Sequence, residues 1–267
     1  MTDRTDRVRQ RRSGSGPVGY PDGVERHPVG AGRALAIAYR VTVARLVSPG
    51  RVVGLLLLSL TATVAGFAVG TSDAADVDAA ASVIANLGFA IVIPVVCLVF
   101  GGAAIGDLRE DKTLIYLWLR PLRRWPVVVG AALAALTIAA PITLPPVIAA
   151  AALTGVGEGL VGATVLASVV GLVTYCSIFT MLGVLLVRHI VWGLAYILIW
   201  EGFIALGGPG VARFAMRTYT RSIIADRTGA DLTGADFSTA IGVVVPLAVA
   251  VGALALASWR LANHDVE

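Results

Sequence analysis

Apolar residues in this chain gather into six long runs that short polar segments separate. Each run holds 17 to 28 residues with few charges, and a helix needs about 20 mostly apolar residues to cross a bilayer. The pattern therefore predicts an all-α, polytopic membrane protein with six transmembrane helices. The predicted spans are 52–70, 82–106, 126–153, 160–187, 190–206 and 238–258.

The segment before the first run has a different character. Residues 1–29 are rich in Arg, Gly, Ser and Pro, a composition that predicts a disordered tail. In residues 30–48, apolar positions recur at helical spacing with arginines between them. This pattern predicts an amphipathic helix that lies in the membrane interface. We expect Ser48, Pro49 and Gly50 to break this helix before the first span.

The third run carries three prolines in its interior, Pro141, Pro145 and Pro146. Proline removes a backbone hydrogen bond and kinks a helix, so neighbouring helices or water must satisfy the freed carbonyl groups. A kinked helix of this kind either lines a pathway or is a packing feature.

Basic residues set the expected orientation. If the N-terminus is cytoplasmic, 17 of the 21 Lys and Arg residues fall in inner segments and four fall in outer loops. Basic residues prefer the cytoplasmic side, so both termini are predicted to be cytoplasmic. The transmembrane domain is expected to cover 30–260, with a short cytoplasmic tail at 261–267.

Composition supports the membrane prediction. Hydrophobic residues make up 57% of the chain and charged residues 14%, and the mean hydropathy is +0.83; these values exclude a soluble domain, a disordered chain and a disulfide scaffold. Cys97 and Cys176 lie inside apolar runs and are expected to pack as small hydrophobic residues. The arginine-rich start suggests either nucleic acid or anionic lipid headgroups, and the lipid interpretation is favoured. No nucleic-acid partner is predicted.

Several kinds of chemistry have no motif in the sequence. No GxxxxGK[ST] occurs, so the chain has no P-loop for ATP. His27, His189 and His264 lie far apart and form no HExxH or similar metal motif. We therefore predict no catalytic residue, no metal site and no cofactor bound by this chain.

One acid and three arginines are candidate pathway or gating residues. Glu201 is the only acid well inside a predicted span, where a charge is costly; it either serves a pathway or is protonated or reaches the outer surface. Arg213, Arg217 and Arg221 recur every four residues in the outer loop 207–237. That spacing predicts a short helix at or dipping into the outer interface, whose arginines either contact anionic lipid or substrate headgroups or extend to water.

The loop between the second and third runs combines a charge cluster with an apolar helix pattern. It reads GDLREDKTLIYLWLRPLRRW from Gly106 to Trp125. Leu114, Leu117 and Trp118 share one helical face, and Pro121 is expected to end the helix. Such a helix is partly interfacial and partly available to a partner.

At these residues the chain resembles the membrane subunits of ABC-2 type transporters. In that family the same loop has an acidic residue, a short charged stretch, Thr-Leu, several apolar residues and Arg-Pro. The early amphipathic helix, six spans and short outer helices also resemble the family, and the stretch after Trp200 is similar to actinobacterial members. The short outer loops depart from subfamilies with a large ectodomain. The matching loop residues are Asp107, Arg109, Glu110, Asp111, Lys112, Thr113, Leu114, Arg120 and Pro121.

The resemblance implies a permease subunit of an ATP-driven exporter in a bacterial plasma membrane. The loop would be a coupling helix that docks on a separate ATP-binding subunit, which would hold ATP and Mg²⁺. Asp107, Glu110 and Asp111 would make polar contacts with that subunit, and the apolar face would pack in its groove or against the bilayer. A homodimer, or a heterodimer with a second permease, would enclose the pathway.

Two other classes remain open from the residues alone. A secondary transporter or channel would need more ionisable groups within the membrane than Glu201 and often has an internal repeat. The second class is a membrane scaffold or a lipid enzyme that uses the outer arginines. Such an enzyme needs a base or metal site, which the sequence does not assemble.

Overall fold

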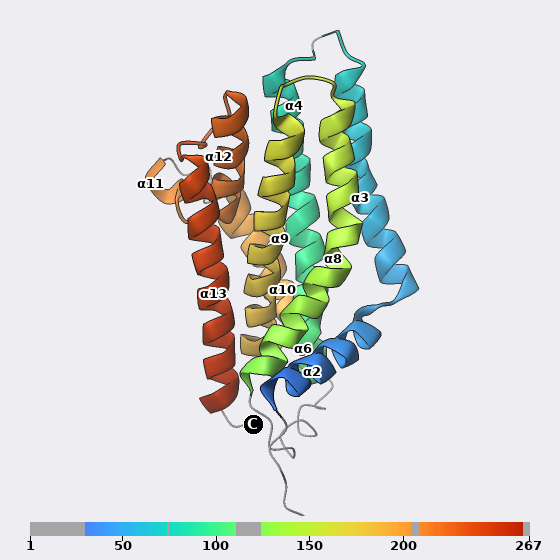
Figure 1. Cartoon of the computed structure of the whole chain (residues 1–267), viewed down its shortest axis with the longest axis vertical. Helices are drawn as coiled ribbons and strands as arrows, with labels where there is room; N and C mark the ends of the chain where they lie inside the picture. Colours follow the sequence, from blue (N-terminus) through green and yellow to red (C-terminus); the bar gives the residue numbers. More distant parts are fainter. Residues whose placement is uncertain (1–29, 74, 111–123, 204–208, 264–267) are drawn as a thin grey trace, which may run out of the picture.

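The computed structural model describes residues 30–73, 75–110, 124–203 and 209–263. All regular secondary structure in these residues is helical, and the long helices lie side by side in an elongated bundle (Figure 1). Five helices are long and apolar enough to cross a membrane, which confirms the predicted class of all-α, polytopic membrane protein. These five are Pro49–Gly70, Val77–Asp107, Trp125–Leu153, Leu160–Leu185 and Thr239–Asn263.

The amphipathic helix and the first span meet at a sharp corner. Helix α2 (Ala31–Leu46) lies obliquely across one end of the bundle, and α3 (Pro49–Gly70) runs along it (Figure 1). The predicted break at Ser48–Gly50 is partly wrong, because Pro49 and Gly50 form the first turn of α3. Proline suits that position since its missing N–H would have no helical partner there.

Helix α2 is held against the start of the third span. A Cβ on Gly130 of α8 (Trp125–Leu153) would lie 2.9 Å from the carbonyl oxygen of Leu35 and 3.0 Å from Cβ of Ala38. Glycine at this position therefore allows α2 to cross α8 closely. We call this part of the molecule the α2 end; the last residues of the final span lie there too (Figure 1).

The second span is a continuous helix that changes pitch along its length. It consists of α4 (Val77–Val83), a π-helical segment η1 (Ile84–Val92), α5 (Ile93–Cys97), a second π segment η2 (Leu98–Gly102) and α6 (Ala103–Glu110). Pro94 has no backbone N–H to donate, which removes one α-helical bond where η1 gives way to α5.

Helix α8 passes through its three interior prolines without interruption. Thr63 of α3 donates its hydroxyl to the carbonyl oxygen of Pro146 at 2.8 Å. A Cβ on Gly66 or Gly70 would clash with backbone atoms at Ala150 or Leu153 of α8. The Gly66–Gly70 pair thus brings these two helices into close contact, as small-residue spacing allows.

Helix α9 (Leu160–Leu185) is the centre of the bundle. Of its most apolar stretch, 67% is buried, whereas only 17% of the corresponding stretch of α3 is buried. Helix α13 (Thr239–Asn263) covers another side of α9 (Figure 1). The outer faces of α3 and α13 are therefore the apolar surfaces that a bilayer would cover.

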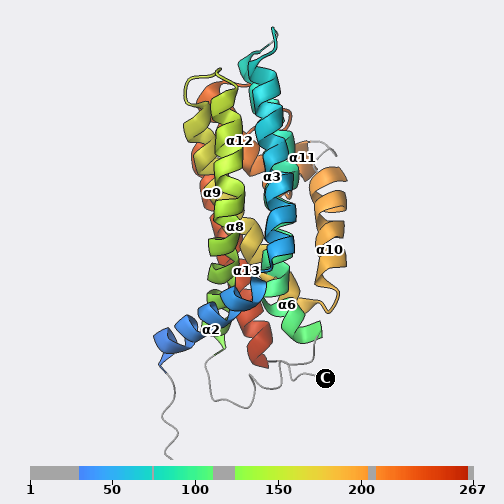
Figure 2. The same ribbon diagram turned by 90° about the vertical axis from the view of Figure 1, so that its right-hand side faces the viewer.

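The predicted fifth span, 190–206, is not among the five long helices. The chain there forms α10 (His189–Ala195) and η3 (Tyr196–Phe203), and residues 204–208 lie outside the described part. Helix α10 rises beside the bundle from the α2 end (Figure 2). Two short helices, α11 (Pro209–Ala212) and α12 (Met216–Thr228), then lie near the opposite end, which we call the α12 end (Figure 1).

This composite segment returns the chain from one end of the bundle to the other. Helix α9 finishes at the α2 end and α13 starts at the α12 end (Figure 1). Because α10, η3 and α12 together bridge that length, α2 and the last turn of α13 lie at the same end. The cytoplasmic placement of both termini stays a prediction, because residues 1–29 and 264–267 lie outside the described part.

Candidate functional site

Of the predicted coupling-loop residues, the structure describes the side chain of Asp107 alone. Arg109 and Glu110 belong to the last turn of α6, with side chains outside the described set. The remaining candidates lie outside the described residues altogether: Asp111, Thr113, Leu114, Leu117, Trp118, Arg120 and Pro121. The predicted coupling helix is therefore neither confirmed nor contradicted.

Asp107 links three helices at the α2 end. Its Oδ2 lies 3.4 Å from Nη1 of Arg51, in the first turn of α3. Its Oδ1 lies 3.9 Å from Nε2 of His189, the first residue of α10. The Asp107 side chain is 30% exposed and that of Arg51 is 44% exposed, whereas His189 is fully buried. The acid thus joins a surface arginine to a buried histidine.

Glycines make room for the histidine ring. A Cβ on Gly102 or Gly106 would clash with the imidazole of His189, and a Cβ on Gly183 of α9 would clash with the backbone at Gly102. The second span, α9 and the start of α10 can therefore approach one another only because these positions lack side chains.

The sequence analysis considered His189 only as a possible metal ligand and missed its burial. The Gly102–Gly106 spacing was the available signal, but a chain with 30 glycines contains such spacings by chance.

Glu201 occupies the second candidate site, where η3 meets α12. It is 1% exposed. Its Oε1 accepts hydrogen bonds from the Tyr196 hydroxyl and from the backbone N–H of Met216, both at 2.9 Å. Its Oε2 accepts a bond from the backbone N–H of Arg217 at 3.0 Å. Met216 and Arg217 are the first two residues of α12, so Glu201 caps the N-terminus of that helix.

This geometry explains how the bundle tolerates a buried acid. The first N–H groups of a helix have no partner within the helix, and a helix N-terminus favours negative charge. Glu201 supplies the acceptor across fifteen residues of sequence, from a different helix. It contacts Arg217 through the backbone and does not extend to the surface, in contrast to one of the two interpretations of its position.

The three candidate arginines occupy different environments. Arg213 is exposed and lies between α11 and α12; its carbonyl oxygen accepts a bond from the Tyr219 hydroxyl at 2.8 Å. Arg217 and Arg221 belong to α12, and so the predicted short helix is present. Arg221 donates to the side-chain oxygen of Asn86 in η1. Burial, with the nearby charge of Arg217, lowers the pKa of Arg221 to about 10, which leaves it cationic at neutral pH.

Helix α12 is unusually polar for its position. It packs between α9 and α13, and its inward residues include Thr218, Thr220 and Ser222. The Ser222 hydroxyl donates to the carbonyl oxygen of Thr218 at 2.9 Å. A Cβ on Gly242 of α13 would lie 3.0 Å from the carbonyl oxygen of Tyr219. A polar helix is therefore inserted tightly into one end of an apolar bundle.

No family model matches the chain, and no curated protein matches it. Among the residues that the structure describes, no group of three or more His, Cys, Asp or Glu side chains is placed to hold a metal ion. The fold itself defines the class: this is a multi-span helical membrane protein with a capped polar helix at one end and a charged cluster at the other.

Proposed function

We propose that the chain is the permease subunit of an ATP-driven exporter of the ABC-2 type. The loop sequence from Asp107 to Pro121 supports this proposal, since it resembles the coupling segment of that family. The positions of the helices along the bundle also support it, because α2 lies across one end and the short helices α11 and α12 lie near the other (Figure 1). In this proposal six passages cross a bacterial plasma membrane and both termini are cytoplasmic.

One observation carries the mechanical part of the proposal. Asp107, the first residue of the motif, contacts Arg51 of α3 and lies beside His189 of α10. A force on the loop would therefore reach the first span and the fifth passage as well as α6 itself. A separate ATP-binding subunit, which would supply ATP and Mg²⁺, would act at this end, because the sequence has no P-loop of its own.

The pathway would form between two permease subunits, as a homodimer or a heterodimer. Glu201 and the arginines of 213–221 would lie at its outer part, where they would gate it or contact the substrate. A secondary transporter or channel centred on Glu201 is the alternative, because a buried acid within a bundle is a common element of ion coupling.

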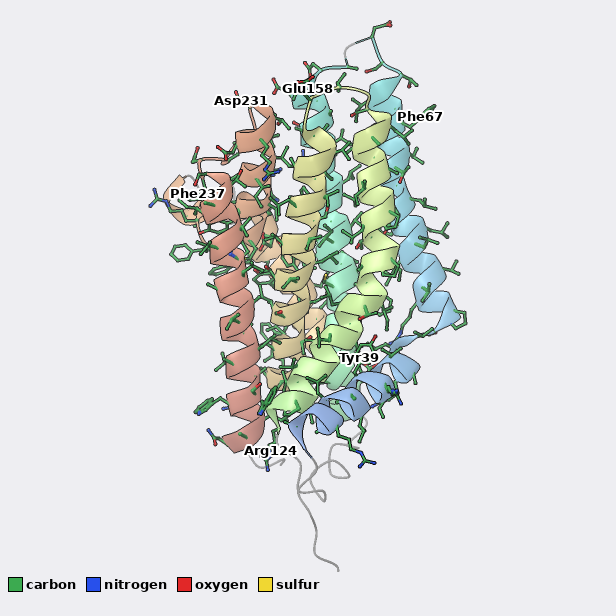
Figure 3. All side chains as sticks on the ribbon, viewed as in Figure 1. Tyr39, Phe67, Arg124, Glu158, Asp231 and Phe237 are labelled. Atoms are coloured by element: carbon green, nitrogen blue, oxygen red, sulfur yellow. The ribbon has the colours of Figure 1, made fainter. Side chains whose placement is uncertain are left out.

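A pulldown from the native host tests the proposal. The tagged protein is extracted in mild detergent, and mass spectrometry searches for a soluble P-loop ATPase. The loop variant Glu110→Ala/Asp111→Ala removes two carboxylates from the motif and leaves the Asp107 contacts in place. The matched control Glu158→Ala/Asp231→Ala removes two exposed carboxylates at the α12 end (Figure 3).

We expect an ATPase to co-purify with the wild type and with the control. The amount of ATPase recovered with the loop variant should be at least fivefold lower. An equal loss in both variants would contradict a specific coupling loop. If no ATPase co-purifies with folded wild-type protein, the exporter proposal fails. Proton or ion flux into vesicles, compared between wild type and Glu201→Gln, then tests the alternative.

A further inference from the structure

Helix α12 packs along the half of α9 that is nearer the α12 end (Figure 1). A Cβ on Gly159, just before α9, would lie 3.7 Å from the carbonyl oxygen of Arg227, close to the end of α12. A Cβ on Gly171 would lie 3.5 Å from Cγ2 of Thr220 and 3.7 Å from Cγ2 of Ile93 in the second span. The two helices are therefore antiparallel, and the second span closes one side of their contact.

The face of α9 that carries Gly171 also carries three hydroxyl groups. Thr164, Ser168 and Tyr175 share this face, because steps of three and four residues return to the same side of a helix. They are 0%, 0% and 1% exposed, and their hydroxyl oxygens have no hydrogen-bond partner in the part of the chain that the structure describes. Thr180 shares this property on another face. About nine in ten buried polar groups bind protein or ordered water, so three neighbouring exceptions point to a ligand.

Other hydroxyl groups of α9 are satisfied within the helix. Thr174 donates to the carbonyl oxygen of Val170 at 2.8 Å, and Ser177 donates to that of Val173 at 2.7 Å. This bond to the carbonyl four residues earlier is a common solution for serine and threonine in a helix. The hydroxyl groups that face α12 do not use it, so the difference follows the face of the helix and not the residue type.

Helix α12 adds polar atoms to the same contact. The Thr220 hydroxyl is buried and donates to the carbonyl oxygen of Arg217 at 2.9 Å, which leaves its oxygen able to accept a bond. Within the described bundle, the buried Nε of Arg221 has no partner, whereas its terminal nitrogens bond Asn86 and the carbonyl oxygen of Thr233. Asn86 is exposed, so Arg221 joins the buried contact to the surface.

Glu201 lies at the inner end of this contact, where it caps α12. The Tyr175 hydroxyl is close enough to interact with the Glu201 charge, but it is not placed to donate a hydrogen bond to the carboxylate. A carboxylate has about four acceptor positions, and protein donors occupy three of them in Glu201. Polar groups that are near each other without bonding are commonly bridged by water.

We propose that a row of internal waters occupies the contact between α9, α12 and the second span and reaches Glu201. Each water would bond two or more of the polar atoms described above, as internal waters do. The rise along α9 is about 6 Å from Thr164 to Ser168 and about 10 Å from Ser168 to Tyr175. Steps of about 2.8 Å cover these lengths with one or two waters and with three.

This water row gives the Glu201 carboxylate contact with water although its side chain is 1% exposed. The aqueous end of the row lies near Asn86 and Arg221, toward the α12 end. The row depends only on the described bundle and stands whether or not an ATPase docks on the protein.

X-ray radiolytic labelling of the purified protein in nanodiscs, followed by mass spectrometry, tests the water row. X-rays split water into hydroxyl radicals, which modify a buried side chain where a bound water lies beside it. Tyr175 is compared with Phe100, a fully buried aromatic side chain of the second span. We expect Tyr175 to be modified roughly fivefold faster, because apolar surroundings hold no bound water. Equal rates at the two residues would reject the water row.

A substitution at Gly171 tests whether the row is continuous. Gly171→Ala adds a methyl group between Ser168 and Tyr175, and its nearest neighbour would be 3.5 Å away, an ordinary packing distance. The protein should therefore fold, whereas the modification rate of Tyr175 should fall roughly threefold because the methyl group displaces water. The matched control is Gly162→Ala in the same helix, where a Cβ would meet no atom within 4 Å; this variant should keep the wild-type rate.

The remaining outcomes contradict the water row. An unchanged Tyr175 rate in Gly171→Ala would show that no row passes this point. An equal fall in both glycine variants would show that the loss arises elsewhere in α9. If Gly171→Ala is not monodisperse in size-exclusion chromatography, Thr220→Val takes its place, since it replaces the facing hydroxyl by a methyl group of similar size. An unchanged Tyr175 rate in Thr220→Val would then reject the row.

Discussion

The two ends of the bundle use carboxylates in different ways. At the α12 end, acids bind backbone N–H groups: Glu201 caps α12, Asp226 accepts from Thr239, and Asp78 accepts from Asp231. At the α2 end, Asp107 contacts the side chains of Arg51 and His189 instead. The bonds of Glu201 and Asp226 bind N–H groups at the first residues of α12 and α13, whereas Asp107 joins side chains of two other helices.

This difference bears on which end can be rearranged. Breaking the Glu201 cap leaves the buried N–H of Met216 and the half-buried N–H of Arg217 without an acceptor. A partly exposed ion pair exchanges its partners for water at little cost. The α12 end is therefore the more rigid of the two, and the α2 end is better suited to respond to a docked partner or lipid.

The largest effect should come from removing the cap at the α12 end. Glu201→Ala leaves the N–H groups of Met216 and Arg217 and the Tyr196 hydroxyl without their acceptor, and should cost about 3 kcal/mol of unfolding free energy. Glu201→Gln keeps one acceptor oxygen and should cost about half as much. Titration with a denaturing detergent measures both variants.

The corresponding substitution at the α2 end removes Asp107, and its effect on the free energy of unfolding should be smaller. Asp107→Ala breaks the contact with the exposed Arg51 and removes the acid that lies 3.9 Å from the buried His189 ring, and should cost about 1 kcal/mol. If Asp107→Ala destabilises the protein as much as Glu201→Ala, the two ends do not differ in the way that their contacts indicate.

An effect between these two is expected where glycines hold the α2 end together. Gly106→Ala places a methyl group against the His189 ring and should cost about 2 kcal/mol through overpacking. His189→Ala in the same chain should restore part of the loss, because it removes the group that the methyl meets. The control is Gly54→Ala in α3, where a Cβ would meet no atom within 4 Å. Thermal unfolding followed by size-exclusion chromatography separates these variants, and a loss in the control equal to that in Gly106→Ala would disprove the packing explanation.

The smallest effect depends on pH. Bonds from the backbone N–H and hydroxyl of Thr239, at 2.7 and 2.6 Å, lower the pKa of Asp226 below its ordinary value of 3.8. A lowered folded pKa means that this stabilisation is complete above about pH 3.8 and disappears as the pH falls through the folded value. The melting temperature of Asp226→Ala should therefore lie below that of the wild type at pH 6, and the difference should shrink as the pH falls below 3.8. A difference that is constant across this range would show that the carboxylate charge is not involved.

The long helices were predictable because each is a single apolar run. The predicted bounds of α8 and α9 lie within a few residues of the observed ones. An apolar run of that length is itself enough to predict a membrane-spanning helix. Pro49 shows where local rules conflict: proline near glycine favours a break, but proline also begins helices, and α3 uses the second rule. The composite passage from His189 was predicted as an ordinary span because its composition is as apolar as the others.

Contacts between distant segments were not predictable from one sequence. Cys97 and Cys176 are buried in the core as expected, but their Sγ atoms lie 3.3 Å apart, which no local pattern indicates. Glu201 was recognised as a costly buried acid, yet its partners are backbone N–H groups, and any residue type supplies those. His189 was missed because its cavity is formed by glycines from another helix.

The short fifth passage gives the molecule a hydrophobic belt of uneven height. Helix α3 has 22 residues and rises about 33 Å, whereas α10 and η3 have 7 and 8 residues and together rise about 22 Å. Their outward residues, such as Val191, Leu198 and Ile199, are exposed and apolar. Among the described residues, the apolar belt beside α10 and η3 is therefore shorter than the belt beside α3, a mismatch that local thinning of the bilayer would accommodate. A neighbouring protein seated against α10 would relieve that deformation, so membrane thickness itself would help to choose which face of the bundle associates.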